Sequence, residues 1–182
     1  NKQKLGLGVT IGTGTSNYNI ISKHFELAEE QDIEFVELSI YDWNIICGRK
    51  IITSELNKLK NLCKNKKLNY TVHGELSVNL LDEENIDFHI EILKRDIEIA
   101  SSINAQHVVT HFGITTLEIH NDTKKFNKLL KMQQEKYYEL GEYAKLNNVI
   151  IVVENLFNFF NDKMHVPVPS IVAEQLELIN HP

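Results

Sequence analysis

The chain has 182 residues, of which 42% are hydrophobic and 24% charged, and its formal net charge is −6 at pH 7. This composition is that of a globular protein with a sizeable core, and we expect a single domain over residues 1–182. The acidic balance makes nucleic acid an unlikely partner. The absence of a long apolar run and of signal-peptide order at the N-terminus predicts a cytoplasmic protein without a membrane span.

Short β-rich apolar runs alternate along the chain with longer stretches of helical periodicity. This alternation predicts five βα units around a parallel sheet. In chain order, the expected elements are strand Leu5–Ile11, a helix through Phe25–Ala28, strand Ile33–Ser39, a helix from about Thr53 to Leu62, strand Asn69–His73, a helix from Ile86 to Ala100, strand Gln106–His111, a helix from Phe126 to Ala144, strand Val149–Glu154, a loop from Asn155 to Pro169, and a helix from about Ser170 to Ile179, with Ser170 as its cap.

The strands are nearly continuous runs of Val and Ile, which indicates burial on both faces. An open sheet and a closed barrel both fit this pattern. The fold class that we favour is α/β, a TIM (β/α)8 barrel of which about the first five βα units are present. No sixth strand follows the last helix, so we expect an incomplete barrel with exposed strand edges and a possible homo-oligomer.

Polar residues close four successive apolar strands, namely Glu37, His73, His111 and Glu154. The carboxyl ends of the strands carry the functional groups of a (β/α)8 barrel. We therefore expect these four side chains to point towards one axis. Taken singly, each has a structural alternative: a strand-end histidine can bond a backbone carbonyl, Glu154 can cap a helix or pair with a lysine, and Glu37 can be a solvated rim residue.

Two imidazoles and a carboxylate are a common set of zinc ligands, and sites richer in carboxylates suit manganese or magnesium. The sequence thus predicts a divalent metal, Mn, Zn or Mg, held by His73, His111 and Glu154. Such a metal can support hydrolysis as well as isomerisation, so the ligand set alone does not identify the reaction. Glu37, Trp43 and Asn155 are the candidates for substrate binding, Trp43 by stacking on a sugar face, although a lone loop tryptophan is more often local packing.

Three segments resemble the xylose isomerase-like TIM barrels. They are Val72–Leu80 (VHGELSVNL), Val109–Gly113 (VTHFG) and Val152–Asn155 (VVEN). The resemblance covers essentially the whole chain in strand order, and the superfamily joins sugar isomerases and epimerases with metal-dependent apurinic-site endonucleases. It implies that Glu154 is a metal carboxylate, and that His73 and His111 either ligate zinc, as in the endonuclease branch, or line the substrate pocket, as in many isomerases. Further family ligands come from strands six to eight, which this chain does not contain.

The resemblance favours a metal-dependent isomerase or epimerase of a sugar or sugar phosphate, which moves a proton between adjacent carbons through an enediolate. In that role Glu154 is the catalytic metal ligand and Glu37 a polar wall of the site. The alternatives are a zinc-dependent apurinic-site endonuclease and a barrel that binds a sugar without turning it over. Leu156–Phe160 follows Glu154–Asn155 where the endonuclease pattern has small residues and glycines, and this departure counts against DNA repair.

Overall fold

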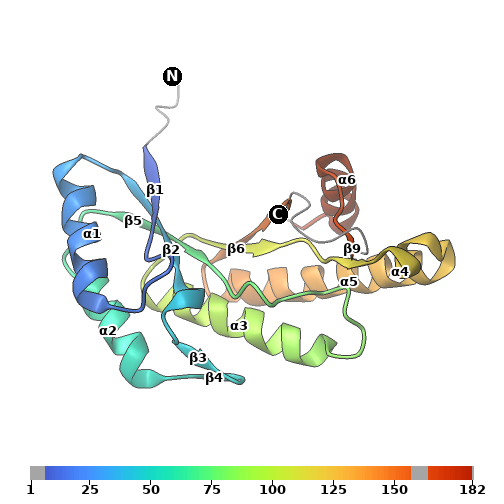
Figure 1. The fold of residues 1–182 in the computed structure, drawn as a ribbon, viewed down its shortest axis with the longest axis horizontal. Coiled ribbons are helices and arrows are strands. Elements are labelled where there is room, and N and C mark those ends of the chain that lie inside the picture. The colour runs from blue at the N-terminus through green and yellow to red at the C-terminus, as the bar shows by residue number, and fades with distance from the viewer. Residues whose placement is uncertain (1–6, 157–163, 182) are drawn as a thin grey trace.

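The computed structural model describes residues 7–156 and 164–181. Its centre is a five-stranded parallel sheet in which each strand pairs with the strand of the preceding βα unit (Figure 1). The strands are β1 (Gly8–Ile11), β2 (Phe35–Ser39), β5 (Asn69–His73), β6 (His107–His111) and β8 (Ile150–Glu154). A doubly wound open sheet would reverse its strand order at a switch point, whereas this order simply follows the chain. The structure thus confirms the expected barrel type, with five strands of the barrel present.

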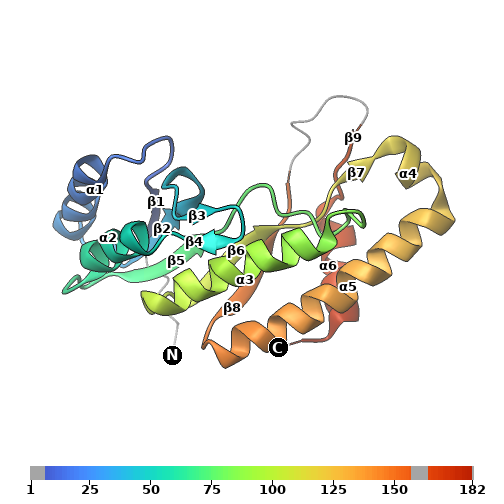
Figure 2. The ribbon, with the colours of Figure 1, turned by 90° about the horizontal axis from the view of Figure 1, so that it is seen from below.

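The main helices are α1 (Tyr18–Glu30), α2 (Thr53–Cys63), α3 (Ile86–Ser102), α5 (Thr123–Leu146) and α6 (Pro169–Ile179). In Figure 2, α2, α3 and α5 lie along one face of the sheet. The core forms there, because strand residues such as Leu38, Val72 and Val108 meet helix residues such as Ile97 and Leu140, and all five are essentially buried. Within the described part of the chain, no helix is long and apolar enough to cross a membrane.

The expected strands and helices are all present, with small shifts at their ends. β1 begins at Gly8, and Leu5 and Gly6 lie outside the described residues. β2 begins at Phe35 rather than Ile33, since the chain first leaves α1 through Asp32, whose φ is 54°. α6 begins at Pro169 with Val168 as its N-cap, so the expectation that Ser170 caps the helix is wrong. Proline suits this first helical position because its missing N–H would have no helical partner there.

The sequence pattern did not predict several short elements. They are the 3-10 helix η1 (Ile40–Asp42), the antiparallel pair β3 (Ile46–Cys47) and β4 (Lys50–Ile51), β7 (Thr115–Thr116), helix α4 (Leu117–Asn121) and β9 (Met164–His165). β9 falls inside the expected loop and pairs with β7, which lies about fifty residues away along the chain. Strands of two residues are too short for apolar periodicity to reveal.

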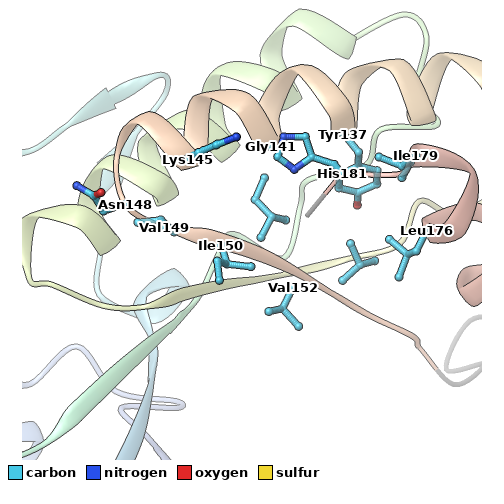
Figure 3. Close-up of a pocket in the computed structure, with 12 residues that line it drawn as sticks. Tyr137, Gly141, Lys145, Asn148, Val149, Ile150, Val152, Leu176, Ile179 and His181 are labelled. Carbon is cyan, nitrogen blue, oxygen red and sulfur yellow. The ribbon is translucent and has the colours of Figure 1, made fainter.

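The β8 edge of the sheet carries a cavity of about 640 Å³ between β8, α5 and α6 (Figure 3). Its lining is mostly apolar and includes Val149, Ile150, Val152, Leu176 and Ile179. Functional sites of this fold lie at the carboxyl ends of the strands, whereas this cavity follows the length of an edge strand. We therefore regard it as uncovered core surface and look for the functional site elsewhere.

Candidate metal centre

His73, His111 and Glu154 are the last residues of three adjacent strands, β5, β6 and β8. One ligand atom from each lies within 4.8 Å of the other two. The Nε2 atom of His73 is 3.3 Å from Oε2 of Glu154, and the Nε2 atom of His111 is 3.7 Å from the same oxygen. Among the described residues, this is the group of histidine, cysteine and acidic side chains that is arranged to hold a metal ion.

Strand register explains why these three side chains meet. His111 pairs with Glu154, and His73 pairs with Val109, two residues before His111. Side chains alternate across a strand with a period of two, so all of these residues face the side of the sheet away from the core. The stagger between β5 and β6 leaves the two imidazole rings in edge contact, with centroids 5.1 Å apart.

The hydrogen bonds of His73 define which of its ring nitrogens faces the cluster. Nδ1 lies 3.1 Å from the carbonyl oxygen of Gly74, and a carbonyl only accepts, so Nδ1 carries the proton in this contact. The structural alternative for His73, a bond to a backbone carbonyl, is thus present but occupies only Nδ1. Nε2 then faces the Glu154 carboxylate at 3.3 Å, where its lone pair could bind a metal ion.

The backbone of His111 is fixed by Tyr137, whose hydroxyl donates a hydrogen bond to the His111 carbonyl oxygen at 2.9 Å. Burial is the main cause that lowers the pKa of His111 below its usual value; the neighbouring His73 acts in the same direction and Glu154 opposes it. A lowered pKa favours the neutral imidazole, which is the form that binds metal ions.

Glu37 lies apart from the cluster. It sits two residues before the end of β2 at Ser39, and it pairs in register with Thr10 and Thr71 rather than with His73. Its Oε1 accepts a hydrogen bond from the Thr10 hydroxyl at 3.1 Å. Ser39 occupies the level of His73. Glu37 faces the same side of the sheet as the expected axis, but it lies one layer deeper and does not join the cluster.

Trp43 is 1% exposed and packs beneath the turn that follows β1. Its indole Nε1 donates to the Gly12 carbonyl at 3.0 Å, so the ring supports the turn from inside the core, and we do not retain it as a sugar-stacking surface. Asn155, the other expected substrate contact, is exposed and directly follows Glu154. The phenylalanine-rich segment after Leu156 lies outside the described residues.

Sequence reasoning missed three residues next to the cluster. The Tyr41 ring makes an edge contact with His73 at a centroid distance of 5.3 Å. Glu75, two residues after His73, has a pKa raised first by burial and then by the charge of Asp42. Asp96 on α3 is completely buried, and its Oδ2 accepts a hydrogen bond from the Glu75 amide at 3.1 Å. A carboxylate inside the apolar stripe of a helix was the signal for Asp96, whereas nothing in the pattern marked Tyr41.

The fold and this cluster define a partial parallel βα barrel with a group of side chains at its strand ends that could hold a metal ion. The family model of the xylose isomerase-like TIM barrel matches residues 25–176, and the chain belongs to this family. No curated protein matches the sequence.

Solved structures with the same fold include several sugar epimerases. A D-tagatose 3-epimerase-like protein superimposes with a TM-score of 0.70 at 18% identity, over 95% of this chain and 60% of its own. The 3-keto-D-glucoside 4-epimerase of E. coli gives 0.70 at 15% identity, over 98% and 66%. A xylose isomerase-like protein from Mycobacterium smegmatis in complex with magnesium gives 0.62 at 16%, over 91% and 54%. At these identities the likeness shows the fold, and the chain spans about 60% of the length of the first of these structures.

Proposed function

We propose that this protein is a metal-dependent isomerase or epimerase acting on a sugar or a sugar phosphate. The observation that carries the proposal is the meeting of His73, His111 and Glu154 within 4.8 Å at the ends of three adjacent strands. The epimerases among the solved structures of this fold support the choice of substrate class. The proposed reaction removes a proton from a carbon next to the sugar carbonyl to form an enediolate. An isomerase returns the proton to the adjacent carbon, and an epimerase returns it to the opposite face of the same carbon.

The three side chains fit a divalent cation such as manganese, zinc or magnesium. His73 and His111 would supply neutral imidazole nitrogens, and Glu154, whose side chain is 49% exposed, would supply a carboxylate oxygen on the open side. When bound, the metal polarises a carbonyl or hydroxyl of the sugar and stabilises negative charge. Asn155 stands at the same strand end, where its amide would bind sugar hydroxyls.

The charge around the strand ends favours a small substrate over DNA. The loop that follows β5 carries Glu75, Asp82, Glu83 and Glu84 within ten residues. A loop with this many acidic residues near the strand ends disfavours a polyphosphate backbone more than a neutral sugar. The net charge of −6 acts in the same direction. Nucleic acid is therefore not part of the proposal.

The first test is the metal content of the purified chain by elemental analysis, after equilibration with manganese, zinc or magnesium and removal of unbound metal. We expect close to one equivalent in the wild type and a large loss in Glu154→Ala and His111→Ala. Glu37→Gln is the matched control, since it removes a carboxylate from the same side of the sheet, one layer below the cluster, and should keep the metal.

The second test is turnover. Ketoses, aldoses and their phosphates are incubated with the metal-loaded protein in D2O, and deuterium entering the carbon next to the carbonyl is followed by NMR, since this exchange reports the proton transfer itself. Metal binding with sugar-dependent stabilisation but no exchange would favour a sugar-binding barrel. Cleavage of a model abasic duplex would favour the endonuclease. A folded chain that binds no metal would overturn the proposal.

A further inference from the structure

Asp96 is an exception on the buried side of α3. The helix turns Ile92, Leu93, Ile97 and Ala100 towards the sheet, and Asp96 lies among them with no exposed surface. Burying a carboxyl group is costly unless it makes hydrogen bonds. A residue of this kind in an otherwise apolar stripe indicates a specific task for its oxygens.

That task is visible at one peptide group. The amide N–H of Glu75 donates to Oδ2 of Asp96 at 3.1 Å. The carbonyl of the same peptide unit belongs to Gly74 and accepts from Nδ1 of His73 at 3.1 Å. The Gly74–Glu75 peptide is therefore hydrogen-bonded through its N–H to the buried Asp96 carboxyl group and through its carbonyl to the His73 ring.

Gly74 lets Asp96 come this close. A Cβ atom at Gly74 would lie 2.6 Å from Oδ2 of Asp96 and 3.0 Å from its Cγ, so even a methyl group would displace the carboxyl. The backbone of Gly74 is not in the left-handed region, so conformational freedom is not why glycine stands here. Its N–H donates to the Val109 carbonyl at 2.9 Å and ties the same turn to β6.

We infer that Asp96 is a positioning residue that selects the tautomer of His73 through the Gly74–Glu75 peptide. By holding the N–H of that peptide, Asp96 keeps the carbonyl aimed at Nδ1, which must then carry the proton. Nε2 is left with its lone pair facing His111 and Glu154. Metal-binding histidines commonly have their second nitrogen fixed by a carboxylate or a carbonyl. Here a peptide group connects the two.

The chain offers a matched control at the next strand. Gln133 on α5 is 1% exposed, and its Oε1 accepts from the Gly113 amide at 3.0 Å, two residues after His111. A Cβ atom at Gly113 would likewise lie 2.5 Å from Gln133. This is the same kind of bond between a buried helix residue and a strand-end glycine turn, but its peptide is not the one that His73 contacts.

The test is the tautomer of His73 in the metal-free chain, read from long-range 1H–15N NMR correlations of the imidazole rings in the presence of a chelator at pH 8. His73→Gln assigns the signal. We expect the Nδ1–H form in the wild type and a shift towards the Nε2–H form, which predominates in free histidine, in Asp96→Ala. Asp96→Asn keeps an acceptor oxygen and should retain the Nδ1–H form, as should Gln133→Ala.

Gly74→Ala provides a second route to the same answer if Asp96→Ala does not fold. The added methyl pushes the carboxyl away while Asp96 remains, and we expect the same change of tautomer. An unchanged Nδ1–H form in whichever of these two variants folds would overturn the inference. An equal shift in Gln133→Ala would also overturn it, because general loosening of the strand ends would then explain the effect.

The consequence for metal binding rests on the proposed function, and a separate measurement addresses it. If His73 binds the metal through Nε2, Asp96→Ala should weaken metal affinity by about 10–100-fold, the range for loss of a group that orients a metal ligand, while Asp96→Asn and Gln133→Ala stay near the wild type. The tautomer is read without metal. A tautomer shift in a protein that binds no metal would therefore contradict the proposed function and leave the inference about Asp96 intact.

Discussion

At the scale of single residues, the proposed metal site depends on which atom of each side chain faces its centre. Nδ1 of His73 is committed to the Gly74 carbonyl, so only Nε2 is available to an ion. The backbone of His111 is fixed by the Tyr137 hydroxyl, while its ring lies half-buried against His73. These contacts hold the two rings in place, which would reduce the ordering cost of binding the proposed metal ion.

The lowered pKa of His111 makes a prediction for stability. At a pH above 6.5, the usual pKa of a histidine side chain, the His111 ring is neutral in both the folded and the unfolded chain. As the pH falls through 6.5, the unfolded chain takes up a proton there and the folded chain does not, so the free energy of unfolding decreases towards lower pH. Urea unfolding with a chelator between pH 7.5 and 5.5 should show a flatter pH dependence for His111→Gln than for the wild type.

A second histidine contributes in the same direction. Burial and then His120 lower the pKa of His165, so some loss of stability towards low pH should remain in His111→Gln. The double variant with His165→Gln should be flatter still. Parallel curves for the wild type and His111→Gln would contradict the assignment of His111 as a ring kept neutral by burial.

At the scale of elements, the turn after β1 is built around Trp43. Gly12 and Gly14 have φ of 84° and 73°, both in the left-handed region. A Cβ at Gly12 would overlap the Trp43 ring, whereas a Cβ at Gly14 meets no atom within 4 Å. The two glycines therefore share the same backbone strain on substitution but differ in the space available.

This pair allows strain and overlap to be separated. Gly14→Ala should cost about 1–2 kcal/mol, the usual cost of a left-handed backbone with a side chain. Gly12→Ala should cost an additional ~1–3 kcal/mol, because the new methyl overpacks the core at Trp43. Urea unfolding of the two variants measures the difference. Equal losses would mean that the Trp43 ring moves aside freely and does not support the turn.

At the scale of the whole molecule, the β8 edge of the sheet is open and exposes apolar side chains. β8 pairs with β6, and in the described part of the chain no strand pairs with its other side. Ile150 is 54% exposed there, and Val152 and Leu176 are also exposed around the cavity of Figure 3. An exposed apolar edge strand favours association.

We expect concentration-dependent self-association of the 182-residue chain, measured by light scattering coupled to size-exclusion chromatography. Ile150→Lys should reduce it, because a charge on the edge disfavours strand pairing and apolar contact. Leu76→Lys is the control: Leu76 is 50% exposed but belongs to the loop after β5, away from this edge. A monomeric wild type, or an equal effect of both variants, would contradict an association through β8.

Much of this protein can be determined from its sequence alone. The order of five strands and five helices and the strand-end positions of His73, His111 and Glu154 follow from local periodicity, whereas the barrel type rests on the resemblance to the xylose isomerase-like barrels, because an open sheet fits the same periodicity. The order and the positions follow because a strand of period two and a helix of period 3.6 each expose their own pattern along the chain. The same periodicity places Asp96 on a buried helix face, although its partner cannot be known from the pattern.

The tertiary structure decided everything that depends on the offset between elements. Stagger between neighbouring strands brings His73 to His111 and leaves Glu37 one layer deeper beside Thr10. The closeness of α3 to β5 connects Asp96 to His73 through one peptide, and the packing of the turn after β1 buries Trp43. Register, side-chain direction and burial are relations between segments far apart in the chain, and local patterns carry no information about them.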